Sequence, residues 1–206
     1  VNKEHALQQA KKSLQGSTEK ISYFSLFLIL FYIFMRSSIH SGISTYLPLF
    51  FMKFRGFEAV TASSLVSGFL LGGVVGTYIS SVLNDRLGAR KILLGSITLS
   101  IPAIFCITIA ATPFFAMAAV VTAGFFIIGS FATTIILAQC MLPNNVGMAS
   151  GLTIGFSVGL GGFGVTILGF LADNYGLDFV MRLLVFLPIT AALVAIKIPI
   201  PKSLQK

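Results

Sequence analysis

A run of 81 residues without a charged side chain, residues 92–172, limits what this chain can fold into. One helical crossing of a bilayer takes about 20 apolar residues, so this run alone has room for three crossings and their turns. Charged residues make up 10% of the whole chain, whereas soluble domains have about 25%. With a mean hydropathy of +0.96, the sequence predicts an integral membrane protein.

Six apolar segments are long enough to cross a membrane as helices. They cover residues 21–52, 60–83, 92–110, 114–141, 147–172 and 178–198. A transmembrane barrel would need alternating strands of about ten residues, and that alternation is missing. The sequence therefore predicts an all-α membrane protein. We expect residues 21–198 to form the six-helix domain, 1–20 a cytoplasmic linker segment and 199–206 a cytoplasmic tail.

The basic residues indicate the orientation. Six crossings return the chain to its starting side, so both termini lie on the same side as the break between the second and third crossings. Ten of the fourteen Lys and Arg residues fall on that side, and three (Lys53, Arg55 and Arg182) fall on the other. Cytoplasmic loops carry the excess of Lys and Arg, so both termini are predicted to be cytoplasmic. The net charge of +8 then reflects orientation, and we expect no nucleic-acid partner.

Two stretches 88 residues apart share a skeleton: LNDRLG at 83–88 and LADNYG at 171–176. The same shift aligns two further pairs of glycines, Gly73 with Gly161 and Gly76 with Gly164. Three predicted crossings separate the copies, so they end on opposite sides of the membrane. This pattern is typical of an inverted repeat of three helices followed by three.

Glycines also recur every fourth residue on two of the segments. Gly68, Gly72 and Gly76 form one ladder, and Gly147, Gly151, Gly155 and Gly159 form a longer one. Small residues on a helix face allow a second helix to approach closely. The partner is either a helix of this chain or a helix that the chain does not contain, and the sequence leaves both interpretations open.

The first stretch resembles the cytoplasmic loop motif of the major facilitator superfamily. The residues that carry the resemblance are Leu83, Asp85, Arg86, Gly88, Arg90 and Lys91. Ser81, Asn84 and Ala89 depart from the family pattern, which puts the motif's usual role in gating in doubt. The resemblance implies the C-terminal half of a twelve-helix secondary transporter in the plasma (inner) membrane. It also implies an N-terminal six-helix half, on the same or a separate chain, as the partner; a second copy of this chain is the alternative.

Within that superfamily the chain looks most like the fosmidomycin-resistance branch. The similar stretches are Arg36-Ser37-Ser38 with Gly42 and Tyr46-Leu47-Pro48-Leu49, and Leu142-Pro143-Asn144 with the glycine-rich segment after it. This resemblance implies alternating access and proton-coupled export (antiport) of small, often anionic compounds or drugs. Three alternatives remain: a non-transporting membrane scaffold, a dimerising half-unit, and an importer of organic anions.

Arg36 lies near the middle of the first crossing, where a cation is costly and is normally functional. Tyr32, Arg36 and His40 follow at intervals of four and share one helix face. We expect this face to line a substrate cavity. The family resemblance implies that the fourth segment lines it too, with Thr133 and Gln139 as neutral hydrogen-bonding groups. The alternative is a structural Arg36, held by backbone carbonyls or by hydroxyls such as that of Ser37.

The sequence does not point to an enzyme. It has no GxSxG, HExxH or CxxC motif and no phosphate-binding loop. No Asp or Glu lies inside any crossing, and Cys106 and Cys140 have no ligand-spaced partners. We therefore expect no catalytic residues, metal site or cofactor, and expect the ligand to be a small molecule.

Overall fold

The computed structural model describes residues 23–141 and 145–197, which form six helices and no strand. Each helix is long and apolar enough to cross a bilayer, so the predicted all-α fold is confirmed. In chain order they are α2 (Tyr23–Arg55), α3 (Ala59–Leu87), α4 (Ala89–Ile109), α5 (Pro113–Met141), α6 (Val146–Tyr175) and α7 (Leu177–Lys197). The predicted linker and tail, Leu142-Pro143-Asn144 and the side chain of Asp85 lie outside the described residues.

Two of the turns are much shorter than the sequence suggests. The bounds of the apolar segments predict breaks at residues 84–91 (NDRLGARK) and 173–176 (DNYG). In the structure α3 runs to Leu87 and α6 to Tyr175, so most of the polar residues in these breaks are helical. A single glycine separates α3 from α4, and another separates α6 from α7. Polar residues near the end of a helix do not by themselves stop the helix. Gly88 and Gly176 stop it because they have φ values of 82° and 87°, which glycine alone adopts without strain.

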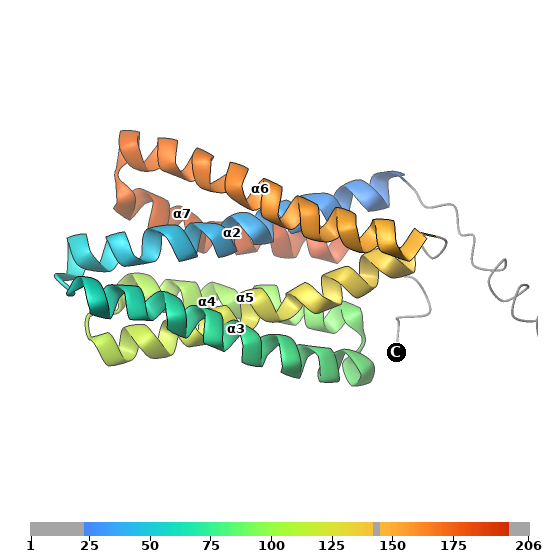
Figure 1. Cartoon of the computed structure of the whole chain (residues 1–206), viewed down its shortest axis with the longest axis horizontal. Coiled ribbons are helices and arrows are strands. Elements are labelled where there is room, and N and C mark those ends of the chain that lie inside the picture. Colours follow the sequence, from blue (N-terminus) through green and yellow to red (C-terminus); the bar gives the residue numbers. More distant parts are fainter. Residues whose placement is uncertain (1–22, 142–144, 198–206) are drawn as a thin grey trace, which may run out of the picture.

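These two turns are closed by equivalent backbone hydrogen bonds. The Gly88 N–H donates to the Asn84 carbonyl at 3.0 Å, and the Gly176 N–H donates to the Ala172 carbonyl at 2.9 Å. Donors and acceptors are both 88 residues apart. The turns lie at opposite ends of the bundle, as an inverted repeat requires (Figure 1).

The two repeats are interleaved in space. Figure 1 shows α3, α4 and α5 in one group and α6, α7 and α2 in the other. The most extensive contacts follow the same rule: α3 packs on α5, and α6 packs on α2. The first repeat is α2–α4 and the second is α5–α7. The first helix of each repeat therefore packs with the last two helices of the other: α2 with α6 and α7, and α5 with α3 and α4.

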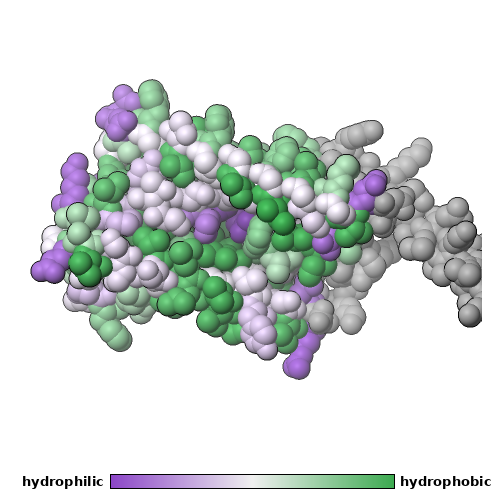
Figure 2. Space-filling model, viewed as in Figure 1, coloured by the Kyte–Doolittle hydropathy of each residue, from purple (hydrophilic) through white to green (hydrophobic). Residues whose placement is uncertain are grey.

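Buried apolar side chains concentrate where α2 meets its neighbours. Tyr32, Leu47 and Phe51 of α2 and Phe69 of α3 are almost completely enclosed. In contrast, α3 and α6 expose many large apolar side chains, and hydrophilic residues gather at the two ends of the bundle (Figure 2). This distribution suits a unit surrounded by lipid or by further helices.

Candidate functional site

Arg36 lies between α2 and α5 and is buried, with 4% of its surface exposed. Its Nη1 donates a long hydrogen bond of 3.4 Å to the Ile127 carbonyl. The guanidinium carbon lies 4.8 Å from the centre of the Phe131 ring, a cation–π contact. Among the described residues Nε has no acceptor. A buried charge needs close partners to offset its lost hydration, so this guanidinium is incompletely satisfied.

Tyr32 and His40 lie one turn before and one turn after Arg36. Tyr32 is fully buried, and in the described part of the chain its hydroxyl has no hydrogen-bond partner. His40 is half-buried, and its ring stacks on Phe69 of α3 with ring centres 5.7 Å apart. The face predicted from the spacing thus contacts α5 through Arg36 and α3 through His40.

The two α5 residues predicted for the cavity have different surroundings. Thr133 is buried, and its Oγ1 has no partner among residues 23–141 and 145–197. Gln139 donates from Nε2 to the Ser150 hydroxyl of α6 at 2.7 Å. Eight residues separate Phe131 from Gln139, which is about 12 Å along a helix. Gln139 therefore lies well towards the predicted cytoplasmic end, away from Arg36.

A row of hydroxyls between α2 and α6 was not predicted from the sequence. Ser37 donates to the Ser157 carbonyl, and the Tyr46 hydroxyl donates to the Val165 carbonyl at 2.9 Å. Small residues of α6 face these serines: Gly161 contacts Ser37 and Ser41, and Gly164 contacts Ser38. Ser37 thus donates to α6, and no hydrogen bond joins it to Arg36 in the described chain. Of the two kinds of partner in the structural alternative, Arg36 has a backbone carbonyl, that of Ile127. Serines at 37, 38 and 41 in an apolar helix were the available signal.

A hollow of about 480 Å³ opens beside His40. Its lining comes from α2, α3 and α5: His40, Leu70, Val74, Thr77, Tyr78 and Ile128. Figure 2 shows a depression near the middle of the viewed face, with hydrophilic atoms on its floor and hydrophobic residues around it. Small-molecule pockets span about 300–1,000 Å³, so the hollow has a suitable size.

The two glycine ladders have different partners. On α3, a Cβ at Gly72 would overlap the Val121 backbone of α5, and one at Gly76 would overlap that of Phe125. The interpretation that this ladder faces a helix outside the chain is therefore wrong. On α6, a Cβ at Gly151 or Gly155 would meet no atom within 4 Å in the described chain. The same holds for Gly147, Gly159 and Gly162, and we call these five glycines the α6 stripe.

Comparison with known families decides the relationship. The model of the Major Facilitator Superfamily matches residues 23–206 of this sequence. The chain belongs to the Major Facilitator Superfamily. Its six helices, arranged as an inverted repeat, correspond to half of the fold of that superfamily.

Two members of the superfamily show the similarity in detail. The fosmidomycin resistance protein of Escherichia coli K12 is 30% identical over 166 residues, covering 81% of this chain and 41% of that protein. The uncharacterized MFS-type transporter YfnC of Bacillus subtilis 168 is 35% identical over 145 residues, covering 70% and 35%. The resemblance to the fosmidomycin-resistance branch is thus supported at modest identity. The chain spans about half the length of these relatives.

The loop motif of the superfamily ties α4 to α7 in this member. Arg90 donates from Nη2 to the Ile196 carbonyl at 3.0 Å, near the end of α7. Leu83, Arg86 and Lys91 are exposed, and the Gly88 N–H closes the end of α3. The motif's contact thus satisfies a carbonyl that the end of α7 would leave free.

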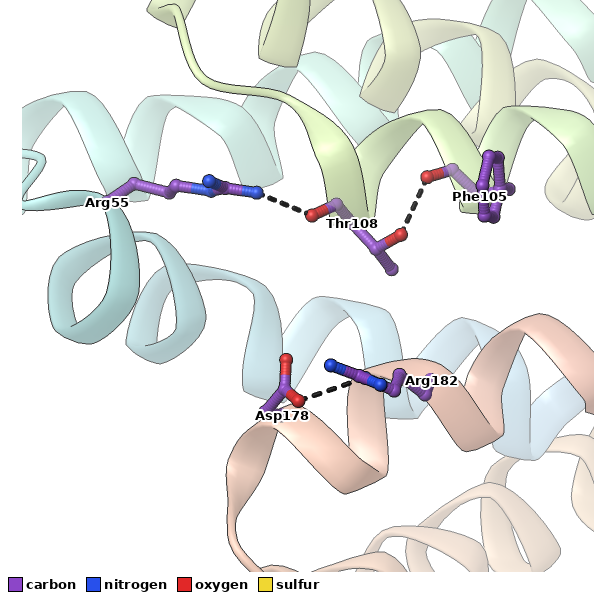
Figure 3. A network of polar contacts seen from close by, with 5 residues as sticks. All are labelled: Arg55, Phe105, Thr108, Asp178 and Arg182. Carbon is purple, nitrogen blue, oxygen red and sulfur yellow. Dashed lines mark hydrogen bonds and ion pairs between the residues drawn. The ribbon is translucent and has the colours of Figure 1, made fainter.

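The opposite end of the unit has a corresponding contact from another helix. Arg55 of α2 donates from Nη2 to the Thr108 carbonyl at 2.7 Å, and Thr108 is the repeat equivalent of Ile196 (Figure 3). The repeat equivalent of Arg90 is Asp178, which cannot donate and instead forms an ion pair of 2.9 Å with Arg182. The missing basic residue of the second motif copy is therefore replaced by Arg55.

Proposed function

We propose that this chain is one six-helix half of a secondary transporter that exports a small anionic compound by alternating access coupled to protons. The observation that carries the proposal is Arg36, a buried guanidinium with one long hydrogen bond and an unpaired Nε in the described chain. The name of the fosmidomycin resistance protein, 30% identical to this chain, is compatible with efflux.

An anion is the ligand that best completes this site. An Arg keeps its proton even when buried, because a guanidinium is a very weak acid. None of the six apolar segments predicted from the sequence contains an Asp or Glu that could pair with it, and Asp173 and Asp178 lie at the ends of α6 and α7. A carboxylate or phosphonate can accept two parallel hydrogen bonds from a guanidinium, which neither Ile127 nor Phe131 provides. Because Arg36 is enclosed, access requires a movement between α2 and α5.

His40 is our candidate for proton coupling. It is the one side chain in the six crossings whose ordinary titration lies near neutral pH. It lies one turn from Arg36 and lines the hollow, so a proton on its ring would act on the same anion. Coupling of this kind predicts that His40→Ala abolishes pH-gradient-driven export while leaving ligand binding measurable.

The missing half of the transporter is proposed to pack on the α6 stripe. Its glycines lie in the open in the described chain, and the relatives are about twice as long as this chain. Gly155→Leu in the complete protein should separate the halves or prevent their assembly, whereas Gly95→Leu, at an open position on α4, should not. A second copy of this chain in the assembled complex would instead identify a homodimer.

The deciding experiment measures efflux by the complete protein in a fosmidomycin-sensitive strain and in inverted vesicles, where both termini are expected to face outward. Arg36→Gln should nearly abolish transport and Arg36→Lys should weaken it strongly, because lysine keeps the charge but loses the planar fork. Arg182→Gln is the matched control, since Arg182 is exposed at the end of the unit.

Normal insertion with full transport in Arg36→Gln would refute the anion site. A wild-type protein that inserts but moves no compound would favour the scaffold alternative. Uptake into intact cells, or release from preloaded inverted vesicles, would favour the importer.

A further inference from the structure

The hollow beside His40 has walls of one chemical kind. Leu70, Val74 and Tyr78 of α3 are 46%, 67% and 74% exposed, so their apolar surfaces are free in this unit. Thr77 is a polar lining residue on this helix, but its hydroxyl donates to the Gly73 carbonyl at 2.8 Å. A molecule in the hollow thus meets apolar surface on the α3 side.

His40 supplies the free polar group of the hollow. Phe69 covers one face of its ring, which fixes the imidazole between α3 and the open space. Arg36 lies one turn further along the same face of α2. Both of these side chains are basic, and among the described residues the lining of the hollow contains no Asp or Glu. The polar end of the hollow is therefore complementary to an acidic group.

The part of the wall formed by α3 and α5 is also preformed. Gly72 and Gly76 hold α3 in direct contact with the α5 backbone. Ile128, which lines the hollow from α5, fills the space beside Gly73, where a Cβ would lie 2.7 Å from the Ile128 Cβ. A binding surface that does not have to rearrange loses less entropy when its ligand binds.

We infer that this hollow binds the apolar group of the exported compound, and that the compound is an amphiphilic organic anion. Its carboxylate or phosphonate would lie towards His40 and Arg36, and an aromatic or branched alkyl group would lie against Leu70, Val74, Tyr78 and Ile128. This inference rests on the proposed function and narrows its substrate class. A compact hydrophilic anion would use the basic end alone.

A homologous series of ω-phenylalkyl phosphonates tests the inference. The affinity of each member is measured from its transport, and from its competition with the other members, in the complete, reconstituted protein. Burying one methylene strengthens binding about fourfold, so affinity should rise by up to that factor for each added methylene until the hollow is full. Val74→Phe fills the hollow from an exposed position and should flatten this series. Val75→Phe is the matched control: Val75 is also exposed on α3 but does not line the hollow.

The outcomes separate the two proposals. Transport of the shortest member with no gain along the wild-type series, or with the same gain in Val74→Phe, would overturn the inference and leave the proposed function standing. Failure of the wild type to transport any member or any other anion would overturn the proposed function. Loss of assembly in Val74→Phe, seen by size-exclusion chromatography, would show that a side chain of the missing half occupies the hollow, and would also overturn the inference.

Discussion

Replacing Gly76 by alanine should loosen one of the tightest contacts in this unit, because backbone meets backbone there. A Cβ at Gly76 would lie 2.8 Å from the carbonyl carbon and from the Cα of Phe125. Non-bonded carbons pack at about 3.5–4.0 Å, so α3 and α5 must separate by about 1 Å. Neither side can rotate away, and overpacking costs about 1–3 kcal/mol. Alanine regains about 1 kcal/mol of helix propensity, which leaves a net loss of up to about 2 kcal/mol.

SDS titration of the complete protein in mixed micelles, followed by circular dichroism, measures this loss as a change in unfolding free energy. Gly95→Ala is the control, because a Cβ there meets no atom within 4 Å of the described chain. It should be neutral or stabilising. Adding Gly72→Ala to Gly76→Ala should cost less than Gly72→Ala alone, because the same separation of the helices accommodates both methyl groups. Equal unfolding free energies for Gly76→Ala and Gly95→Ala would refute the reasoning.

Three further predictions concern the ends of the helices. Gly88→Ala and Gly176→Ala should each lower the unfolding free energy by about 1–2 kcal/mol in the same titration, since both glycines have a positive φ that alanine adopts only with strain. A loss at one position alone would contradict the equivalence of the two turns. Cysteine at Arg90 should be labelled only from the cytoplasm and cysteine at Asn174 only from outside, and identical sidedness would refute the inverted repeat. Arg90→Ala should lower the unfolding free energy by about 0.3–1 kcal/mol through its lost bond to α7, whereas Lys91→Ala, which removes the same charge, should not.

The sequence predicted the six crossings and the repeat because those depend on local composition and on spacing along the chain. Its 88-residue shift even pairs the cap donors Gly88 and Gly176. The partner of each helix face could not be predicted in the same way. Glycines on Gly76's face and on Gly155's face have the same spacing, yet the first face meets α5 and the second meets open space. Periodicity shows that residues share a face, but the packing of distant segments decides what covers it.

The candidate site shows the same limit. The spacing of Tyr32, Arg36 and His40 correctly placed them on one face, but it could not show that Arg36 is enclosed while His40 borders a hollow. Ser37 was available in the sequence as a hydroxyl for Arg36, and its bond to the Ser157 carbonyl depends on a helix 120 residues away. The roles of the predicted cavity residues remain predictions for the transport experiments.

The interleaving of the two repeats has a consequence for biogenesis. The most extensive contacts of α2 are with α6 and α7, so α2 must wait for the last two helices of the unit before it can pack fully. The hydrogen bond from Ser37 to Ser157 closes over 120 residues, which takes about 6–24 s to synthesise at 5–20 residues per second. Arg36 meets its α5 partner Ile127 only after 91 of these residues have been made, and until then α2 is held by lipid or by an insertion factor. A nascent chain stalled after α4 would therefore expose its least hydrophobic helix, and the quality control of the cell would act on that helix first.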